Sequence, residues 1–191
     1  MQYSQMPLLP KHEMKYLKAR TFGGVKLRKR RKIARPLQEG SIHHVVFKSA
    51  KAVGKLSFYR HKVEVCRLLK KQSRKFFIEI LDFVNMGNHL HLKIRFKDRR
   101  RCGQFLKSFA ALVARKVTGA NKINPFGRFW DGLVYTRVLL TKLEELGLRG
   151  YFEGNHRQRE LSYSQREYYL KAFNEYMSRL RRTRAATLVN L

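Results

Sequence analysis

The sequence predicts one α+β domain in which strands and amphipathic helices alternate. Two runs with strand character flank a turn at residues 85–88, and apolar side chains recur at helical spacing near residues 56–72 and 100–117. The chain has 191 residues, of which 43% are hydrophobic and 12% aromatic, enough to build one core with appendages. The element order predicted from these patterns is β-α-β-β-α-β-α, followed by another helix.

The first predicted strand and helix follow residue 40. Residues 43–48 of SIHHVVFKS are β-branched and apolar enough for a short strand. A helix is expected from about Leu56 to Gln72, with an apolar stripe at helical spacing made by Tyr59, Val63, Cys66 and either Leu69 or Lys70. The next stretch, KFFIEILDFVNM, is apolar on both faces and is typical of a central strand.

A hairpin is expected next. Residues 85–88, Asn-Met-Gly-Asn, have turn chemistry, and HLHLKIRF at 89–96 follows them as an antiparallel strand. A second helix is predicted from about Arg100 to Val117, with the stripe Cys102, Phe105, Leu106, Phe109, Leu112, Val113 and Val117. FWDGLVYTRVLL predicts a fourth strand.

Two capping boxes mark the start of the last two helices. Thr141 with Glu144 opens a third helix, and Ser164 with Glu167 opens a final one that ends in the basic run RLRRTR. The complete order predicts a ferredoxin-like antiparallel sheet with both crossover helices on one face. We expect a basic, flexible N-terminal arm at residues 1–40, a catalytic domain at 41–160, and a C-terminal helix and tail at 161–191.

The charge balance predicts a polyanionic partner. Lys and Arg number 43 against 13 Asp and Glu, a net charge of +30. Nucleic acid is the usual partner of such a surplus, because each neutralised phosphate releases condensed counterions. Residues 15–36 alone carry ten Lys or Arg, and we expect this arm to grip phosphates through Arg28, Lys29, Arg30, Arg31 and Lys32. A solvated tail, or a packing protein of the ribosomal or chromatin kind, is the alternative.

The remaining composition indicates an intracellular protein. The two cysteines, Cys66 and Cys102, form no CxxC pair and suit a reducing compartment. The N-terminal residues lack the uninterrupted apolar region of a signal peptide, and no segment is long and apolar enough to span a membrane. We therefore expect a cytoplasmic protein with no membrane partner.

The hairpin strand carries two histidines one residue apart. Alternation along 89–96 directs Leu90, Leu92, Ile94 and Phe96 to one face, and His89, His91, Lys93 and Arg95 to the other. The first set is expected to face the helices. Two imidazoles side by side on the other face can share a divalent ion, but they make only a partial site that requires a third donor. The plain alternative is a pair of solvated histidines.

These residues resemble the HUH motif (histidine, hydrophobic residue, histidine) of single-tyrosine transposases, including the REP-associated tyrosine transposases. Met86-x-Asn88-His89-x-His91 resembles the motif itself. GRFWDGLVYTRVL resembles the Trp-containing strand of that family, and Tyr151-Phe152-Glu153-Gly154-Asn155 resembles its tyrosine segment. The resemblance covers roughly residues 40–156.

The resemblance implies a metal-dependent enzyme that cuts and rejoins single-stranded DNA, often with a hairpin and often as a homodimer. His89, His91 and Asn155 would hold Mg²⁺ or Mn²⁺, and Tyr151 would be the nucleophile that forms a 5′-phosphotyrosine linkage. Tyr151 and Asn155 are four residues apart and would share a helix face. Lys93, Arg95 and Arg137 would contact DNA.

The sequence also departs from the family pattern. His156 stands where the family usually has proline, and Gly147, Gly150 and Gly154 crowd the expected tyrosine helix, each at a cost of about 1 kcal/mol relative to alanine. Such a helix is either mobile, closely packed against a neighbour, or broken near Gly147. Tyr135 is the strongest rival nucleophile, and His43 or His44 would lie beside the histidine pair. A non-catalytic, domesticated DNA-binding protein and a related HUH nickase remain as alternatives.

Overall fold

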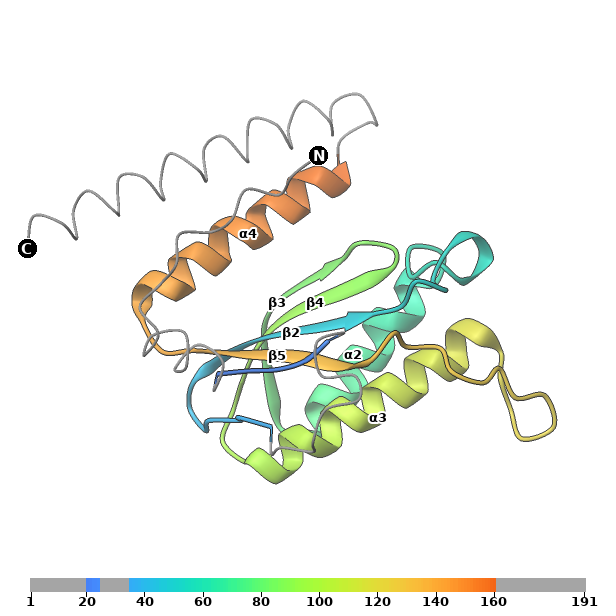
Figure 1. Cartoon of the computed structure of the whole chain (residues 1–191), viewed down its shortest axis with the longest axis horizontal. Coiled ribbons are helices and arrows are strands. Elements are labelled where there is room, and N and C mark those ends of the chain that lie inside the picture. Colours follow the sequence, from blue (N-terminus) through green and yellow to red (C-terminus); the bar gives the residue numbers. More distant parts are fainter. Residues whose placement is uncertain (1–19, 25–34, 161–191) are drawn as a thin grey trace, which may run out of the picture. The chain divides into compact units, whose positions relative to one another are not determined.

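Five strands form one antiparallel sheet. The structure, a computed structural model, describes residues 20–24 and 35–160. The strands are β1 (Thr21–Gly24), β2 (Ile42–Lys48), β3 (Ile78–Asn85), β4 (His89–Phe96) and β5 (Leu133–Leu139). Their order across the sheet is β1-β5-β2-β4-β3 (Figure 1). All four neighbouring pairs run antiparallel.

Two crossover helices pack on one face of this sheet. Helix α2 (Lys62–Phe76) connects β2 with β3, after the short 3₁₀ turn η2 (Gly54–Leu56), and α3 (Arg99–Thr118) connects β4 with β5. Both lie on the same side of the sheet, in contact with each other (Figure 1). The core between them contains the inward side chains of β4 and a row of phenylalanines, Phe47, Phe58, Phe105 and Phe109.

The order β2-α2-β3-β4-α3-β5, with β2 and β4 as the central strands of that four-stranded unit, confirms the predicted ferredoxin-like sheet. Helix α4 (Lys142–Glu160) follows β5 as expected. The chain divides after Glu145 into two compact units, so that α4 begins in the first and continues in the second. The final helix predicted from Ser164 lies outside the described residues.

The edge strand β1 was not among the predicted elements. It pairs with β5 through Thr21 opposite Arg137 and Phe22 opposite Thr136. Gly23 adopts a φ of +88°, and a Cβ there would lie 2.1 Å from the carbonyl oxygen of Val134, so only glycine fits this position. Residues of the basic N-terminal stretch therefore extend the sheet beyond β5.

The position of β3 differs from the prediction. Residues 78–85 form an edge strand with a bulge between Ile80 and Asp82, and not the expected central strand. Ile78 and Val84 are buried, whereas Ile80 and Phe83 pack against the core from half-buried positions. A run that is apolar on both faces thus did not distinguish a central strand from an edge strand.

The apolar stripe of α2 agrees with the prediction only at Leu69. The helix begins at Lys62, about six residues later than expected, and buries Val65, Leu69 and Gln72. Val63 is 70% exposed and Cys66 is exposed. Gln72 has a polar partner inside, because its Oε1 accepts a 2.9 Å hydrogen bond from Ser108 of α3. The predicted and observed stripes differ by rotation about the helix axis.

Helices α3 and α4 agree more closely with prediction. Helix α3 buries all the residues of its expected stripe except Leu112, which is half-buried. At the start of α4, the Thr141 hydroxyl accepts from the Glu144 backbone N–H at 3.2 Å, and Glu144 Oε2 accepts from the Thr141 N–H at 3.4 Å, which confirms the capping box. Helix α4 continues through Gly147, Gly150 and Gly154 without a break. Among the described residues no helix is long and apolar enough to cross a membrane.

Candidate active site

The two histidines of the motif lie side by side on β4. Leu90, Leu92 and Ile94 are fully buried toward the helices, so alternation places His89 and His91 on the opposite face of the sheet. Their ring centroids are 4.7 Å apart and their planes are nearly perpendicular, at 83°. We call the sheet surface that carries His44, His89, His91 and Lys93 the histidine face.

Each motif histidine has a hydrogen-bond partner for Nδ1. The side-chain oxygen of Asn88, from the turn, lies 2.5 Å from Nδ1 of His89. Nδ1 of His91 lies 3.1 Å from Nε2 of His44 on β2. In His89 the nitrogen suited to bind a cation is therefore Nε2, which is the common arrangement of metal-binding histidines. In His91 it is Nε2 when Nδ1 carries the proton of the hydrogen bond to His44.

The environment keeps these imidazoles neutral. Burial lowers the pKa of His91 to about 3, with smaller contributions from His44 and His89. Burial and, to a smaller extent, the charge of Arg137 lower the pKa of His44 to about 4. The pKa of His89 is lowered by burial and then by Lys48, its register neighbour on β2. A neutral imidazole is the form that a metal ligand requires.

The donor set fits a divalent cation as a partial site. Two neutral imidazoles on one strand face have suitable chemistry for Mn²⁺ and, with oxygen donors added, for Mg²⁺. Within residues 20–24 and 35–160, no group of three or more His, Cys, Asp or Glu side chains is arranged to hold a metal. The third protein donor predicted from the sequence is a side chain of another type, the carboxamide of Asn155.

Helix α4 carries the predicted nucleophile and third ligand. Tyr151 and Asn155 lie one turn apart on one face of this helix, within the second compact unit. Asn155 is 9% exposed, and in the described part of the chain its amide nitrogen has no hydrogen-bond partner. The meeting of this pair with His89 and His91 stays a prediction.

Three of the cations predicted to bind DNA have acidic neighbours in the fold. Lys93 is 9% exposed, and its ammonium lies 2.8 Å from Glu145 Oε1. Arg137 contacts Glu144 at 3.0 Å, and Arg95 contacts Glu79 at 3.4 Å. The run Arg28, Lys29, Arg30, Arg31 and Lys32 lies outside the described residues, so its role in DNA binding stays a prediction.

Tyr135, the rival nucleophile, lies two strands from His91. Val46 of β2 is paired with His91 on one side and with Tyr135 of β5 on the other. The ring of Tyr135 meets that of His44 edge-on, with centroids 6.1 Å apart, and burial raises the pKa of its phenol. That pKa shift disfavours the phenolate that a nucleophile needs.

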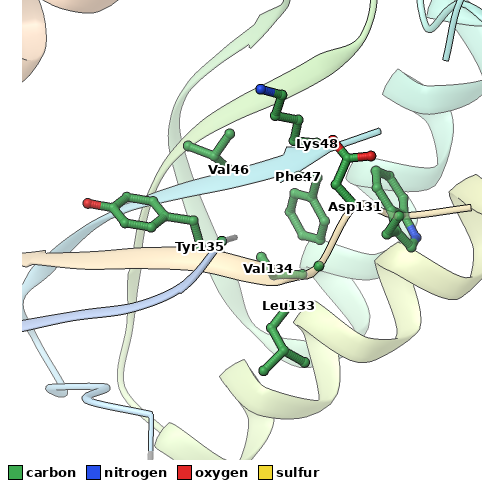
Figure 2. A pocket seen from close by; sticks show the side chains of 10 residues that line it. Val46, Phe47, Lys48, Asp131, Leu133, Val134 and Tyr135 are labelled. Carbon is green, nitrogen blue, oxygen red and sulfur yellow. The ribbon is translucent and has the colours of Figure 1, made fainter. Parts of the chain in front are cut away.

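A largely apolar cavity of about 210 Å³ lies at the ends of β2 and β5. Tyr135 lies on one side of it, and Lys48 and Asp131 lie on the other (Figure 2). The Asp131 carboxylate accepts a 2.7 Å hydrogen bond from the backbone of Ala50, which joins the strand ends. Trp130 belongs to the same wall and packs against the core, with Nε1 donating to the carbonyl of Ala110 at 3.1 Å.

Some residues of the site were not found by sequence reasoning. The sequence left open whether His43 or His44 approaches the motif; His44 does, while His43 lies on the helix side against Phe96. The acidic partners Glu144 and Glu145 were also missed as members of the site, although the capping box had marked Glu144. Alternation along β2 was the signal that could have separated His43 from His44.

Comparisons with known proteins returned distant structural matches. A structure of a REP-associated tyrosine transposase bound to a REP hairpin matches 64% of this chain and 70% of its own, with 12% identity and a TM-score of 0.49. A candidate transposase from Deinococcus radiodurans R1 matches 65% of this chain and 98% of its own, with 14% identity and a TM-score of 0.40. No family model and no curated protein matches the sequence.

Proposed function

We propose that the protein is a transposase that cuts and rejoins single-stranded DNA with a tyrosine nucleophile. The observation that carries this proposal is the pair of neutral imidazoles, His89 and His91, side by side on the histidine face of a ferredoxin-like sheet. The sequence resemblance of Tyr151 to Asn155 to the tyrosine segment of HUH transposases supplies the nucleophile. The net charge of +30 suits a DNA substrate.

In this proposal Tyr151 attacks a backbone phosphorus. The bond from the phenolic oxygen to phosphorus forms as the bond from phosphorus to the 3′ oxygen breaks, and the phenolic proton is lost to a base while the departing 3′ oxygen gains a proton. The products are a 5′-phosphotyrosine linkage and a free 3′-hydroxyl. Since the phosphotyrosine linkage is itself a phosphodiester and conserves the energy of the bond that was broken, the 3′-hydroxyl of another strand can attack it, release the tyrosine and complete strand transfer.

His89, His91 and Asn155 would hold Mg²⁺ or Mn²⁺. When bound, such a cation supplies charge stabilisation for the phosphate oxygens as negative charge develops on them. Hairpin-bearing single-stranded DNA is the substrate class that the sequence resemblance implies, and a homodimer is its expected assembly.

The test is covalent capture of DNA. A labelled pool of single-stranded oligonucleotides, each with a fixed hairpin beside a randomised tract, is incubated with the protein and Mn²⁺ and then run on a denaturing gel. We expect a protein–DNA adduct that excess EDTA prevents and that His89→Ala abolishes. Tyr151→Phe should bind the pool with unchanged affinity and form no adduct.

Tyr135→Phe is the matched control, because it removes the hydroxyl of a tyrosine whose ring meets that of His44 edge-on, and it should leave the adduct intact. An adduct that persists in Tyr151→Phe would refute the assignment of the nucleophile. Binding without any adduct would favour the non-catalytic DNA-binding protein, and an adduct whose 3′ end never joins another strand would favour the nickase.

A further inference from the structure

His44 reaches the histidine pair from the neighbouring strand. In the sheet register it lies between Lys93 of β4 and Arg137 of β5, with its half-buried side chain on the histidine face. Its ring lies edge to edge with that of His91, with centroids 5.3 Å apart and planes 17° from parallel. The closest polar atoms are His44 Nε2 and His91 Nδ1, at 3.1 Å.

Only one proton can occupy this hydrogen bond when both rings are neutral. If His91 Nδ1 carries it, then His44 Nε2 accepts, and Nε2 of His91 keeps its lone pair for a cation. If His44 Nε2 carries the proton, then His91 is protonated on Nε2 and cannot bind a metal through that atom. The direction of one hydrogen bond therefore decides whether His91 can be a ligand.

The other motif histidine, His89, shows which tautomer the site requires. Asn88 presents its side-chain oxygen to Nδ1 of His89 at 2.5 Å, and a carboxamide oxygen can only accept. His89 is therefore protonated on Nδ1 and has its lone pair on Nε2. For the two rings to serve one cation, His91 needs the same tautomer.

We propose that His44 is a positioning residue that accepts the Nδ1–H of His91 and so holds His91 with Nε2 as its metal-binding atom. His44 would do for His91 what Asn88 does for His89. The inference rests on the proposed metal site, and it adds a residue from β2 to a site otherwise drawn from β4 and α4. The edge-on contact with Tyr135 at 6.1 Å restrains the His44 ring from its other side.

The test combines imidazole tautomers with metal affinity. Long-range ¹H–¹⁵N NMR spectra of the metal-free protein report the tautomer of His91, and titration with Mn²⁺ alone, followed by electron paramagnetic resonance, reports affinity. In the wild-type protein we expect the Nδ1–H tautomer. In His44→Leu the tautomer equilibrium of His91 should shift toward Nε2–H, and Mn²⁺ binding should weaken by about tenfold to a hundredfold.

Two further variants keep the result interpretable. His44→Gln retains a neutral acceptor of similar reach and should preserve the tautomer, with Mn²⁺ affinity within a fewfold of wild type. His61→Leu removes a half-buried histidine whose Nε2 contacts the Lys55 carbonyl at 3.0 Å, far from the motif in the sequence, and should change neither signal.

The outcomes separate this inference from the proposed function. A His91 found in the Nε2–H tautomer in the wild-type protein would overturn the inference, and so would unchanged Mn²⁺ affinity in His44→Leu. A wild-type protein with the predicted tautomer but without Mn²⁺ binding would contradict the proposed metal site and leave the hydrogen-bond assignment standing.

Discussion

His43 and His44 are neighbours in sequence but lie on opposite faces of β2. His44 contacts the motif histidine, whereas His43 is fully buried against Phe96 on the helix side. The backbone N–H of Gln38 donates to His43 Nε2 at 3.2 Å, and His43 Nδ1 lies 3.0 Å from the Ser41 carbonyl, so this ring must be neutral with its proton on Nδ1.

Burial lowers the pKa of His43 to about 4 from its usual value of 6.5, which makes stability depend on pH. Below about pH 6.5 His43 binds a proton in the unfolded chain but not in the folded chain. The free energy of unfolding therefore falls as the pH drops below about 6.5, and it levels off near pH 4. The contribution of this residue is about 1.4 kcal/mol per pH unit within that window.

His43→Gln should remove this contribution, since glutamine does not titrate. Urea unfolding at pH 7 and pH 5 measures how the free energy of unfolding depends on pH. This dependence should be smaller in the variant than in the wild-type protein, because about one proton fewer is taken up on unfolding. Equal slopes of the free energy of unfolding against pH in both proteins would mean that His43 binds a proton as readily in the folded state as in the unfolded state.

At the scale of elements, the turn between β3 and β4 holds the motif in place. Gly87 has a φ of +82°, and a Cβ there would lie 2.8 Å from the ring of Tyr59. Its carbonyl accepts a 2.7 Å hydrogen bond from the Phe58 N–H, and its own N–H donates to Asn85 Oδ1 at 2.9 Å. The turn is thus joined to the segment that leads into α2.

Gly87→Ala should lower the free energy of unfolding by about 2 kcal/mol, because alanine disfavours the left-handed backbone and its methyl group displaces Tyr59. Gly40→Ala is the matched control: Gly40 has a φ of +74°, but a Cβ there would meet no atom within 4 Å. Denaturant unfolding measures both. If Gly87→Ala lowers the free energy of unfolding no more than Gly40→Ala does, the contact of the new methyl group with Tyr59 costs no free energy.

The sequence predicted the kinds and order of elements better than their rotation and place in the sheet. The stripe of α3 was correct because its seven apolar residues define one face, whereas α2 has Val63 and Val65 on different faces and periodicity alone chose the wrong one. Alternation placed the β4 side chains correctly. Which strand forms an edge depends on the whole chain, and the run at 75–86 does not encode it.

The candidate site was likewise predictable only where local spacing determines it. Spacing indicated His89 and His91 as neighbours, but the His44 contact requires the register of β2 against β4, which no local pattern contains. The partners of Lys93 and Arg137 come from the start of α4, about 50 and 7 residues away in sequence, and they depend on tertiary structure.

At the scale of the whole molecule, the net charge of +30 is expected to drive the proposed binding of DNA. The wild-type protein should bind single-stranded DNA with a steep dependence on salt. Replacing Arg28, Lys29, Arg30, Arg31 and Lys32 with glutamine should weaken binding. It should also reduce the slope of log K against log salt by about 0.7 for each phosphate that the arm no longer neutralises.

The matched control for that variant replaces five exposed cations on α2, which lies on the opposite side of the sheet from the histidine face: Lys62, Lys70, Lys71, Arg74 and Lys75. Fluorescence anisotropy over a salt series measures both variants. If the slope falls as far in the α2 variant as in the N-terminal one, the charge acts as a general cationic surface and not as a gripping arm.

The central claim is that Tyr151 becomes joined to DNA, and peptide mapping of the adduct tests it most directly. Trypsin cuts after Arg149 and Arg157, so Tyr151 is the only tyrosine in its peptide, GYFEGNHR. After nuclease and trypsin digestion, mass spectrometry should find this peptide with a nucleotide attached through phosphate. The same mass increment on FWDGLVYTR, which contains Tyr135 alone, or on any other peptide, would contradict the account.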